Sequence, residues 1–311
     1  MMEDRSGSNL PAMEHSSVSV KNCFLVRLMS PLGCYPADSL LSASAALMVS
    51  PDICFSIVRV EEGWSTEVDT LNAAEIPLFG SILLTGEAGS PYLYPYPTVH
   101  LIKTESLENV NEQSIAKCKA LLLAQLQKKC GNDQERILKI HRPPIFGGDN
   151  YELVPGKNRD KEQLDVLSRL ETAPPVILRG VNCLLKARMA FRHHELSEAG
   201  CIFLWIALDA AHSLILQKLR EAGNANPTSA DAARYFEQIT GVETDGEKFF
   251  EYDYVNRIRA IHPDNRFGAE AVPQLLADDF FELNDMLIPL FDFLVSELPA
   301  RAGQTEATGR N

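Results

Sequence analysis

The sequence contains few of the features that mark membrane-spanning or secreted proteins. No uninterrupted apolar run reaches the roughly 20 residues that a membrane-crossing helix needs. The richest stretch, residues 201–219, is broken by Asp209 and His212. The first residues also lack the apolar core of a secretory signal. We therefore expect a cytoplasmic protein that does not associate with membranes.

Metal-binding and nucleotide-binding motifs are absent as well. The 7 cysteines include no C-x-x-C pair, and their odd number and scattered positions are typical of reduced thiols. There is no H-E-x-x-H zinc motif, no G-x-x-x-x-G-K-[ST] loop, no G-x-G-x-x-G fingerprint and no G-x-S-x-G elbow. We predict that the protein binds no metal and no organic cofactor.

Positive charge is also scarce. The chain carries 29 lysines and arginines against 42 aspartates and glutamates, a formal net charge of −13. This balance argues against broad, charge-driven binding to nucleic acid. Residues 176–220 depart from this acidic balance, because they include six basic side chains and only three acidic ones. A nucleic-acid site would therefore be local.

Apolar residues make up 45% of the 311 residues, which is enough to build the cores of two modest domains. The fold class we predict is an α+β N-terminal module followed by an all-α bundle of four to five helices. The predicted segments are a disordered N-terminus at 1–21, the α+β module at 22–141, a linker with a short helix at 142–173, the helical domain at 174–298 and a disordered tail at 299–311.

The sequence of the α+β module predicts mainly short strands. Apolar and β-branched runs predict strands at residues 23–29, 53–60, 76–84 and 98–103. The Tyr-Pro alternation at 92–97 indicates an edge strand or a loop, since proline cannot donate to a β-ladder. A helix is predicted over residues 106–129 from its apolar stripe.

Beyond residue 174 the pattern is helical throughout. Helices are predicted at residues 176–191, 195–221, 228–241, 246–262 and 272–298. The second of these is apolar on every side at its centre, as expected of a buried central helix. Thr228 and Asp231 have the spacing of a capping box, and Gly241 provides the stop.

The segment with the most chemistry is FFEYDYVNRIRAIHPDNRFG, residues 249–268. It contains Arg257 and His262 in an R-x4-H spacing, with proline directly after the histidine. The spacing alone is weak, because it also occurs at Arg136 with His141 and at Arg188 with His193. The context is distinctive: a late helix, a His-Pro end and an apolar helix about fifty residues earlier.

In this context the C-terminal region resembles the HEPN family, in particular its Apea-like branch, whose members bind or cut RNA. That family has an R-x(4–6)-H motif at the end of a helix. The segment FLWIALDAAHSL, residues 203–214, resembles the family's long central helix, in which an acidic residue follows a leucine. Asp209 occupies the acidic position. The resemblance covers about 125 residues and none of the N-terminal region.

The resemblance implies a metal-independent endoribonuclease of a defence or stress system. Catalysis would fall to His262, Arg257 and Asp209, and substrate contacts to Arg259 and Asn256. It also implies a homodimer through the helical domain, which brings two motifs into one cleft, and a possible nucleotidyltransferase partner.

One position departs from the family pattern. Family nucleases usually have a polar residue directly after the motif arginine, where this chain has Ile258.

The motif residues suit this chemistry. Positions i and i+5 lie about 140° apart on an ideal helix, but the residue before a proline disfavours the helical conformation, so the helix should end at His262. The imidazole can then turn towards Arg257. An imidazole exchanges protons near neutral pH, and a guanidinium binds a phosphate through two hydrogen bonds.

Two other readings remain open. The domain could bind RNA, a nucleotide or a partner protein without catalysis, or it could be a purely structural dimerisation bundle. In the structural reading, Arg257 pairs with Asp209, whose carboxylate is costly to bury alone. His262 then serves as a helix C-cap, and His212 is a core histidine.

Overall fold

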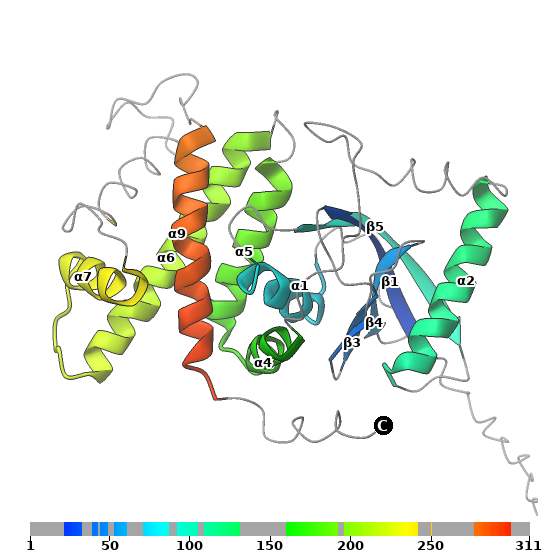
Figure 1. Ribbon diagram of the computed structural model, residues 1–311, viewed down its shortest axis with the longest axis horizontal. Coiled ribbons are helices and arrows are strands. Elements are labelled where there is room, and N and C mark those ends of the chain that lie inside the picture. The colour runs from blue at the N-terminus through cyan, green and yellow to red at the C-terminus, as the bar shows by residue number, and fades with distance from the viewer. Residues whose placement is uncertain are drawn as a thin grey trace, which may run out of the picture.

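A computed structural model of the chain combines an N-terminal antiparallel sheet with a larger set of helices (Figure 1). It describes residues 22–32, 39–42, 44–48, 53–60, 71–86, 92–104, 109–130, 160–191, 196–241, 250 and 277–299. The predicted order, a sheet-containing part followed by helices, is confirmed. The two predicted disordered ends, 1–21 and most of 299–311, lie outside the described residues.

Five strands form one sheet in the order β2-β3-β4-β1-β5, and every neighbouring pair is antiparallel. The strands are β1 (Asn22–Leu32), β2 (Ser39–Leu41), β3 (Ala45–Met48), β4 (Cys54–Val60) and β5 (Tyr92–Thr104). β5 is an edge strand that contains Pro95 and Pro97, so the edge-strand interpretation of the Tyr-Pro segment is confirmed.

Seven helices occur in the described part of the chain. They are α1 (Glu75–Leu84), α2 (Glu112–Cys130), α4 (Asp160–Leu170), α5 (Pro175–Phe191), α6 (Ser197–Glu221), α7 (Ser229–Thr240) and α9 (Ala277–Ser296). All but α1 match helices predicted from the sequence. Of the helix predicted at 246–262, the structure describes Phe250 alone.

The strand predicted at residues 76–84 is wrong, because this segment forms helix α1. All ten residues of α1 are buried, so it shows no polar face and no helical period. A continuous apolar run cannot by itself be distinguished from a buried strand. Pro77 was the available signal, since proline is tolerated in the first turn of a helix and not in a central strand.

The sheet buries both of its faces, and the alternation along β1 separates them. Phe24, Val26 and Leu28 belong to a smaller core that also includes Leu122 and Leu126 of α2. On the other face, Leu25 and Met29 of β1 join a large core that continues into the helical bundle.

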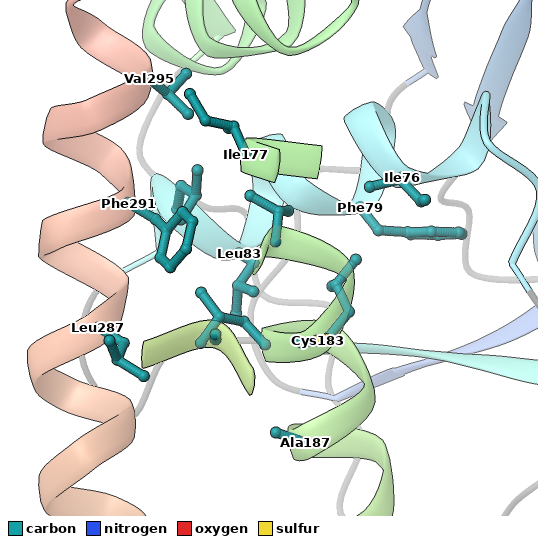
Figure 2. Packing of buried hydrophobic residues seen from close by; sticks show 14 of the residues in the cluster. Ile76, Phe79, Leu83, Ile177, Cys183, Ala187, Leu287, Phe291 and Val295 are labelled. Atoms are coloured by element: carbon teal, nitrogen blue, oxygen red, sulfur yellow. The ribbon is translucent and has the colours of Figure 1, made fainter. Parts of the chain in front are cut away.

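Helix α1 joins the sheet to the bundle. It contacts β3 and β5 on one side and α4, α5 and α9 on the other. Figure 2 shows Ile76, Phe79 and Leu83 of α1 within the same cluster as Phe291 of α9 and Ile177 of α5. A single hydrophobic core therefore contains residues from both sides of the linker predicted at 142–173.

A buried ion pair fixes α1 to the sheet. Arg27 Nε donates to both carboxylate oxygens of Glu75, at 3.0 and 3.2 Å, and both side chains are essentially inaccessible. Arg27 lies opposite Ser56 in the β1–β4 register, and the Ser56 hydroxyl donates to Glu75 at 2.6 Å. The amide of Asn72 donates to the same carboxylate at 2.9 Å. The buried charge is therefore fully hydrogen-bonded.

Helix α6 is the central element of the bundle and contacts α5, α7 and α9. By length and composition alone, its segment Glu198–Glu221 could cross a membrane. Half of the apolar window is buried inside the protein, as it is in the core helix of a soluble bundle, so this is weak evidence for a span. The cytoplasmic location stays a prediction.

Removing one partner of the buried ion pair should destabilise the fold strongly. Glu75→Gln removes the Glu75 charge from the buried Arg27 guanidinium, which should lower the free energy of unfolding by about 3–5 kcal/mol. The double variant Arg27→Met/Glu75→Leu removes both charges and should recover most of that loss. Urea unfolding of the full chain measures both, and equal losses in the single and double variants would contradict the assignment.

Close packing at Gly180 gives a second prediction. A Cβ placed there would lie 2.2 and 2.3 Å from ring atoms of Phe291. Gly180→Ala should therefore cost about 1–3 kcal/mol, although alanine ordinarily favours a helix by about 1 kcal/mol. At Gly200 the nearest atom to such a Cβ is the Ala187 carbonyl oxygen at 3.1 Å. Gly200→Ala, compared by thermal unfolding, should cost less.

Candidate functional site

Most of the predicted site lies outside the described residues. This holds for the predicted catalytic residues Arg257 and His262 and for the predicted substrate contacts Arg259 and Asn256. Asp209 is described, on the middle of helix α6. The part of the candidate site that the structure describes is therefore α6 near Asp209, together with the elements that pack against this part of the helix.

The side chain of Asp209 is exposed, although it sits in the most apolar part of α6. Its neighbours Leu208 and Ala211 are buried in the core of the bundle. A solvated carboxylate does not carry the desolvation penalty that a buried one would. The burial cost that we expected for Asp209, as the reason for a structural pair with Arg257, therefore does not arise.

One helical turn after Asp209, His212 lies where three parts of the chain meet. Its Nε2 is 3.4 Å from the hydroxyl of Ser229, the first residue of α7. Its ring is 4.6 Å from the ring of Phe250, with an angle of 32° between the planes. Phe250 is itself 6% exposed. His212 thus connects the central helix both to the first residue of α7 and to Phe250.

The surroundings of His212 favour its neutral form. Burial lowers the pKa of this imidazole below its ordinary value of 6.5. The N-terminus of α7, which carries a partial positive charge, also disfavours a cation next to Ser229. At neutral pH the ring is therefore uncharged, so one of its nitrogens can accept a hydrogen bond.

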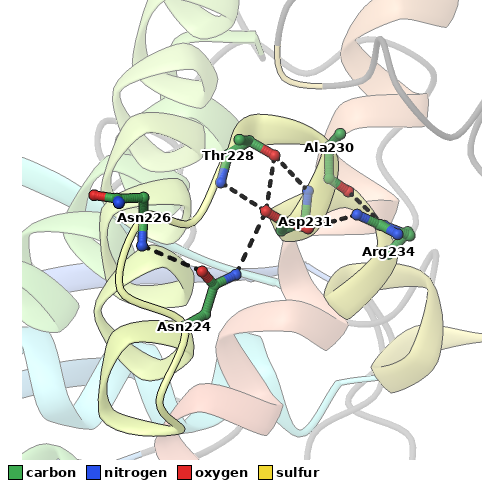
Figure 3. A network of polar contacts seen from close by, with 6 residues as sticks. All are labelled: Asn224, Asn226, Thr228, Ala230, Asp231 and Arg234. Atoms are coloured by element: carbon green, nitrogen blue, oxygen red, sulfur yellow. Dashed lines mark hydrogen bonds and ion pairs between the residues drawn. The ribbon is translucent and has the colours of Figure 1, made fainter.

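The position of Ser229 is set by the network that begins α7 (Figure 3). The Thr228 hydroxyl accepts from the Asp231 amide, and the Asp231 carboxylate accepts from the Thr228 amide at 2.9 Å. This is the predicted capping box. Asn224 donates to the same carboxylate. These contacts lower the pKa of Asp231, so its charge persists well into the acidic range.

Other reactive side chains in the described part of the chain are poorly placed for chemistry. Five cysteines are buried: Cys23, Cys54, Cys118, Cys183 and Cys201. Burial raises the pKa of the Cys118 thiol to about 11 and also raises the pKa of Cys183, which keeps both thiols protonated. Among the described residues, no group of three or more His, Cys, Asp and Glu side chains is arranged to hold a metal ion.

Sequence reasoning missed the contact between His212 and Phe250. The sequence indicates a core histidine at position 212, and its partly buried position agrees with that interpretation. For Phe250 the sequence indicates only a place in a predicted helix. The two residues are 38 positions apart and share no periodic signal, so only the tertiary structure brings the two rings together.

Comparison with known proteins adds no relative: no family model, no curated protein and no solved structure matches this chain. The resemblance to the HEPN family therefore depends on the motif residues and on their helical context.

The lowered pKa of His212 predicts an acid-sensitive contact. In the unfolded chain the imidazole has its ordinary pKa of 6.5, so below that pH the unfolded state binds a proton more readily than the folded state. The free energy of unfolding should fall as the pH drops below that value. His212→Gln cannot be protonated there and should lose less stability between pH 7.5 and 5.5. The matched control is His193→Gln, and equal acid sensitivity of His212→Gln and the unsubstituted protein would contradict the prediction.

Proposed function

We propose that this protein is a HEPN-like RNA-directed protein that cleaves RNA without a metal. In this proposal His262 is the general acid or base, Arg257 binds the scissile phosphate and Asp209 orients one of them. Arg259 and Asn256 contact the substrate. The observation that carries the proposal is the exposed Asp209 on the central helix, one turn from the place where Phe250 packs.

The arrangement around Phe250 supports bringing these residues together. Phe250 precedes Arg257 by seven residues in the sequence. Seven residues span about 10 Å as a helix and about 25 Å when extended. Asp209 and His212 are separated by about 4.5 Å along the axis of α6. Because Phe250 packs on His212, the chain that follows it is long enough for Arg257 to reach the Asp209 carboxylate.

The proposed reaction needs no group beyond these side chains. The ribose 2′-oxygen attacks the adjacent phosphorus as its proton passes to a base, and the bond from phosphorus to the 5′-oxygen breaks as that oxygen takes up a proton. An imidazole with a pKa near neutrality can serve either step. The guanidinium of Arg257 would offset the charge that develops on the phosphoryl oxygens. Two copies of the chain would supply a second histidine.

A non-catalytic role is the second candidate, and two observations favour it. Ile258 stands where the family's nucleases usually have a polar residue, and the chain carries a net charge of −13. In that case the same surface would bind RNA, a nucleotide or a protein such as a nucleotidyltransferase. A purely structural bundle is the third candidate.

The first test is cleavage of a mixed RNA pool by the purified full chain in EDTA. His262→Ala should reduce the rate by about 10²–10⁴-fold, the usual contribution of a positioned acid or base. Asp209→Asn should slow cleavage without abolishing it. His193→Ala removes the histidine of another R-x4-H spacing and should change nothing.

Two results would contradict the nuclease. If no cleavage occurs while the protein is folded, catalysis by this chain alone is excluded, and RNA binding measured by filter retention then tests the second candidate. If His193→Ala reduces the rate as strongly as His262→Ala, the chemistry does not belong to the motif.

A further inference from the structure

Helix α5 carries only positive charge, although the chain as a whole is acidic. Its charged residues are Arg179, Lys186 and Arg188, and none of its 17 residues is acidic. The chain has a formal net charge of −13. Helix α5 thus holds three of the six basic side chains of residues 176–220 and none of the three acidic ones.

Two of these cations, Arg179 and Lys186, lie on the same face of α5. They are seven residues apart, which corresponds to about 10 Å along the helix axis and a rotation of only about 20°. Arg179 is exposed and Lys186 is partly buried. Burial raises the pKa of the Cys183 thiol between them, and the charges of both Lys186 and Arg179 partly offset that effect. Both cations are therefore close to one point on the helix.

Helix α6 packs along α5 in the antiparallel direction and borders this face (Figure 1). The Lys186 ammonium lies over the Phe203 ring of α6, 5.8 Å from its centroid. This geometry is that of a cation–π interaction, which restrains a long and otherwise mobile side chain. We call Arg179, Lys186 and Phe203 the basic strip.

The basic strip ends level with the described part of the candidate site. Arg179 lies seven residues before Lys186 on α5, and Ala210 lies seven residues after Phe203 on α6. Because the two helices are antiparallel, Arg179 is level with Ala210 and with its neighbour Asp209. From residue 199 to residue 210, α6 contains no acidic residue other than Asp209.

The charge of the strip is not neutralised within the protein. Among the residues that the structure describes, none forms an ion pair with Arg179 or Lys186. Cations of this kind attract polyanions, because each phosphate that they neutralise releases a condensed counterion. A guanidinium can also bind a phosphate through two hydrogen bonds.

We propose that the basic strip binds the backbone of single-stranded RNA, with Arg179 and Lys186 on separate phosphates and Phe203 holding Lys186 in place. Cations about 10 Å apart match phosphates about three nucleotides apart in a stacked strand, at roughly 3.4 Å per nucleotide. This inference rests on the proposed function for the identity of the polymer, and it leads the strand to Asp209. Binding itself can be measured without cleavage.

The first measurement is the fluorescence anisotropy of a labelled 12-nucleotide RNA of mixed sequence, titrated with the full chain. Its 2′-hydroxyls are methylated, so it cannot be cleaved by attack of a 2′-oxygen. Arg179→Gln and Lys186→Gln should each weaken binding by about tenfold, since each removes a charged hydrogen bond. Each should also reduce the slope of log K against log salt by about 0.7. Phe203→Leu keeps the charge and should weaken binding by only about two- to fivefold.

The control for net charge is Lys128→Gln. Lys128 is an exposed residue of α2, which packs on the sheet and not on the bundle. This substitution removes the same charge and should leave affinity and salt slope nearly unchanged, while thermal unfolding confirms that every variant is folded. The proposal is overturned if the chain does not bind the RNA, or if the strip variants weaken binding no more than Lys128→Gln does. Equal affinity for a 12-residue polyglutamate peptide would assign the strip to an acidic protein partner and overturn it as well.

Cleavage of the unmethylated RNA separates this inference from the proposed function. If the protein cuts RNA, the strip variants should raise KM and leave kcat nearly unchanged, because they remove binding that is equal in the ground state and the transition state. Unchanged KM would overturn the strip while the nuclease stands. Loss of binding in the strip variants of a chain that cuts no RNA would support the strip and refute the nuclease.

Discussion

Helix α1 is the element on which the rest of the structure depends, because it has no face in contact with solvent. It fills the space between the sheet and the bundle, so each layer is completed by the other (Figure 1). A buried helix must neutralise any charge that it carries. Glu75 does so through Arg27 and Ser56, two residues that lie opposite each other on neighbouring strands. The position of α1 is therefore set by the register of β1 against β4.

This arrangement explains which parts of the fold could be predicted from the sequence. Helices α4, α5, α7 and α9 each expose a polar side, so the spacing of their apolar residues reports them directly. Helix α1 exposes none, and its apolar run therefore reads as a strand. The register of Arg27 with Ser56, and the approach of Gly180 to Phe291, are pairings across the fold that leave no local trace in the sequence.

The candidate site, like the fold, can be predicted from the sequence only in part. The sequence identifies residue types with suitable chemistry, and its pattern correctly places Asp209 on the central helix. It does not indicate that this aspartate is exposed, because the helix around it reads as apolar on every side. Nor does it indicate that Phe250 packs on His212, one turn away. The described part of the candidate site is thus the exposed side of α6 at Asp209, one turn from the buried contact between His212 and Phe250.

The placement of α1 also affects how the chain is made. About ninety residues separate its end from the first buried residues of α5, which it must contact. At a synthesis rate of about 5–20 residues per second, α1 waits for roughly 5–20 seconds before that partner exists. During this time an apolar segment that is buried on all sides in the final structure has only the sheet to cover it. Until α4 and α5 are made, the nascent chain therefore presents apolar surface of the kind that promotes aggregation.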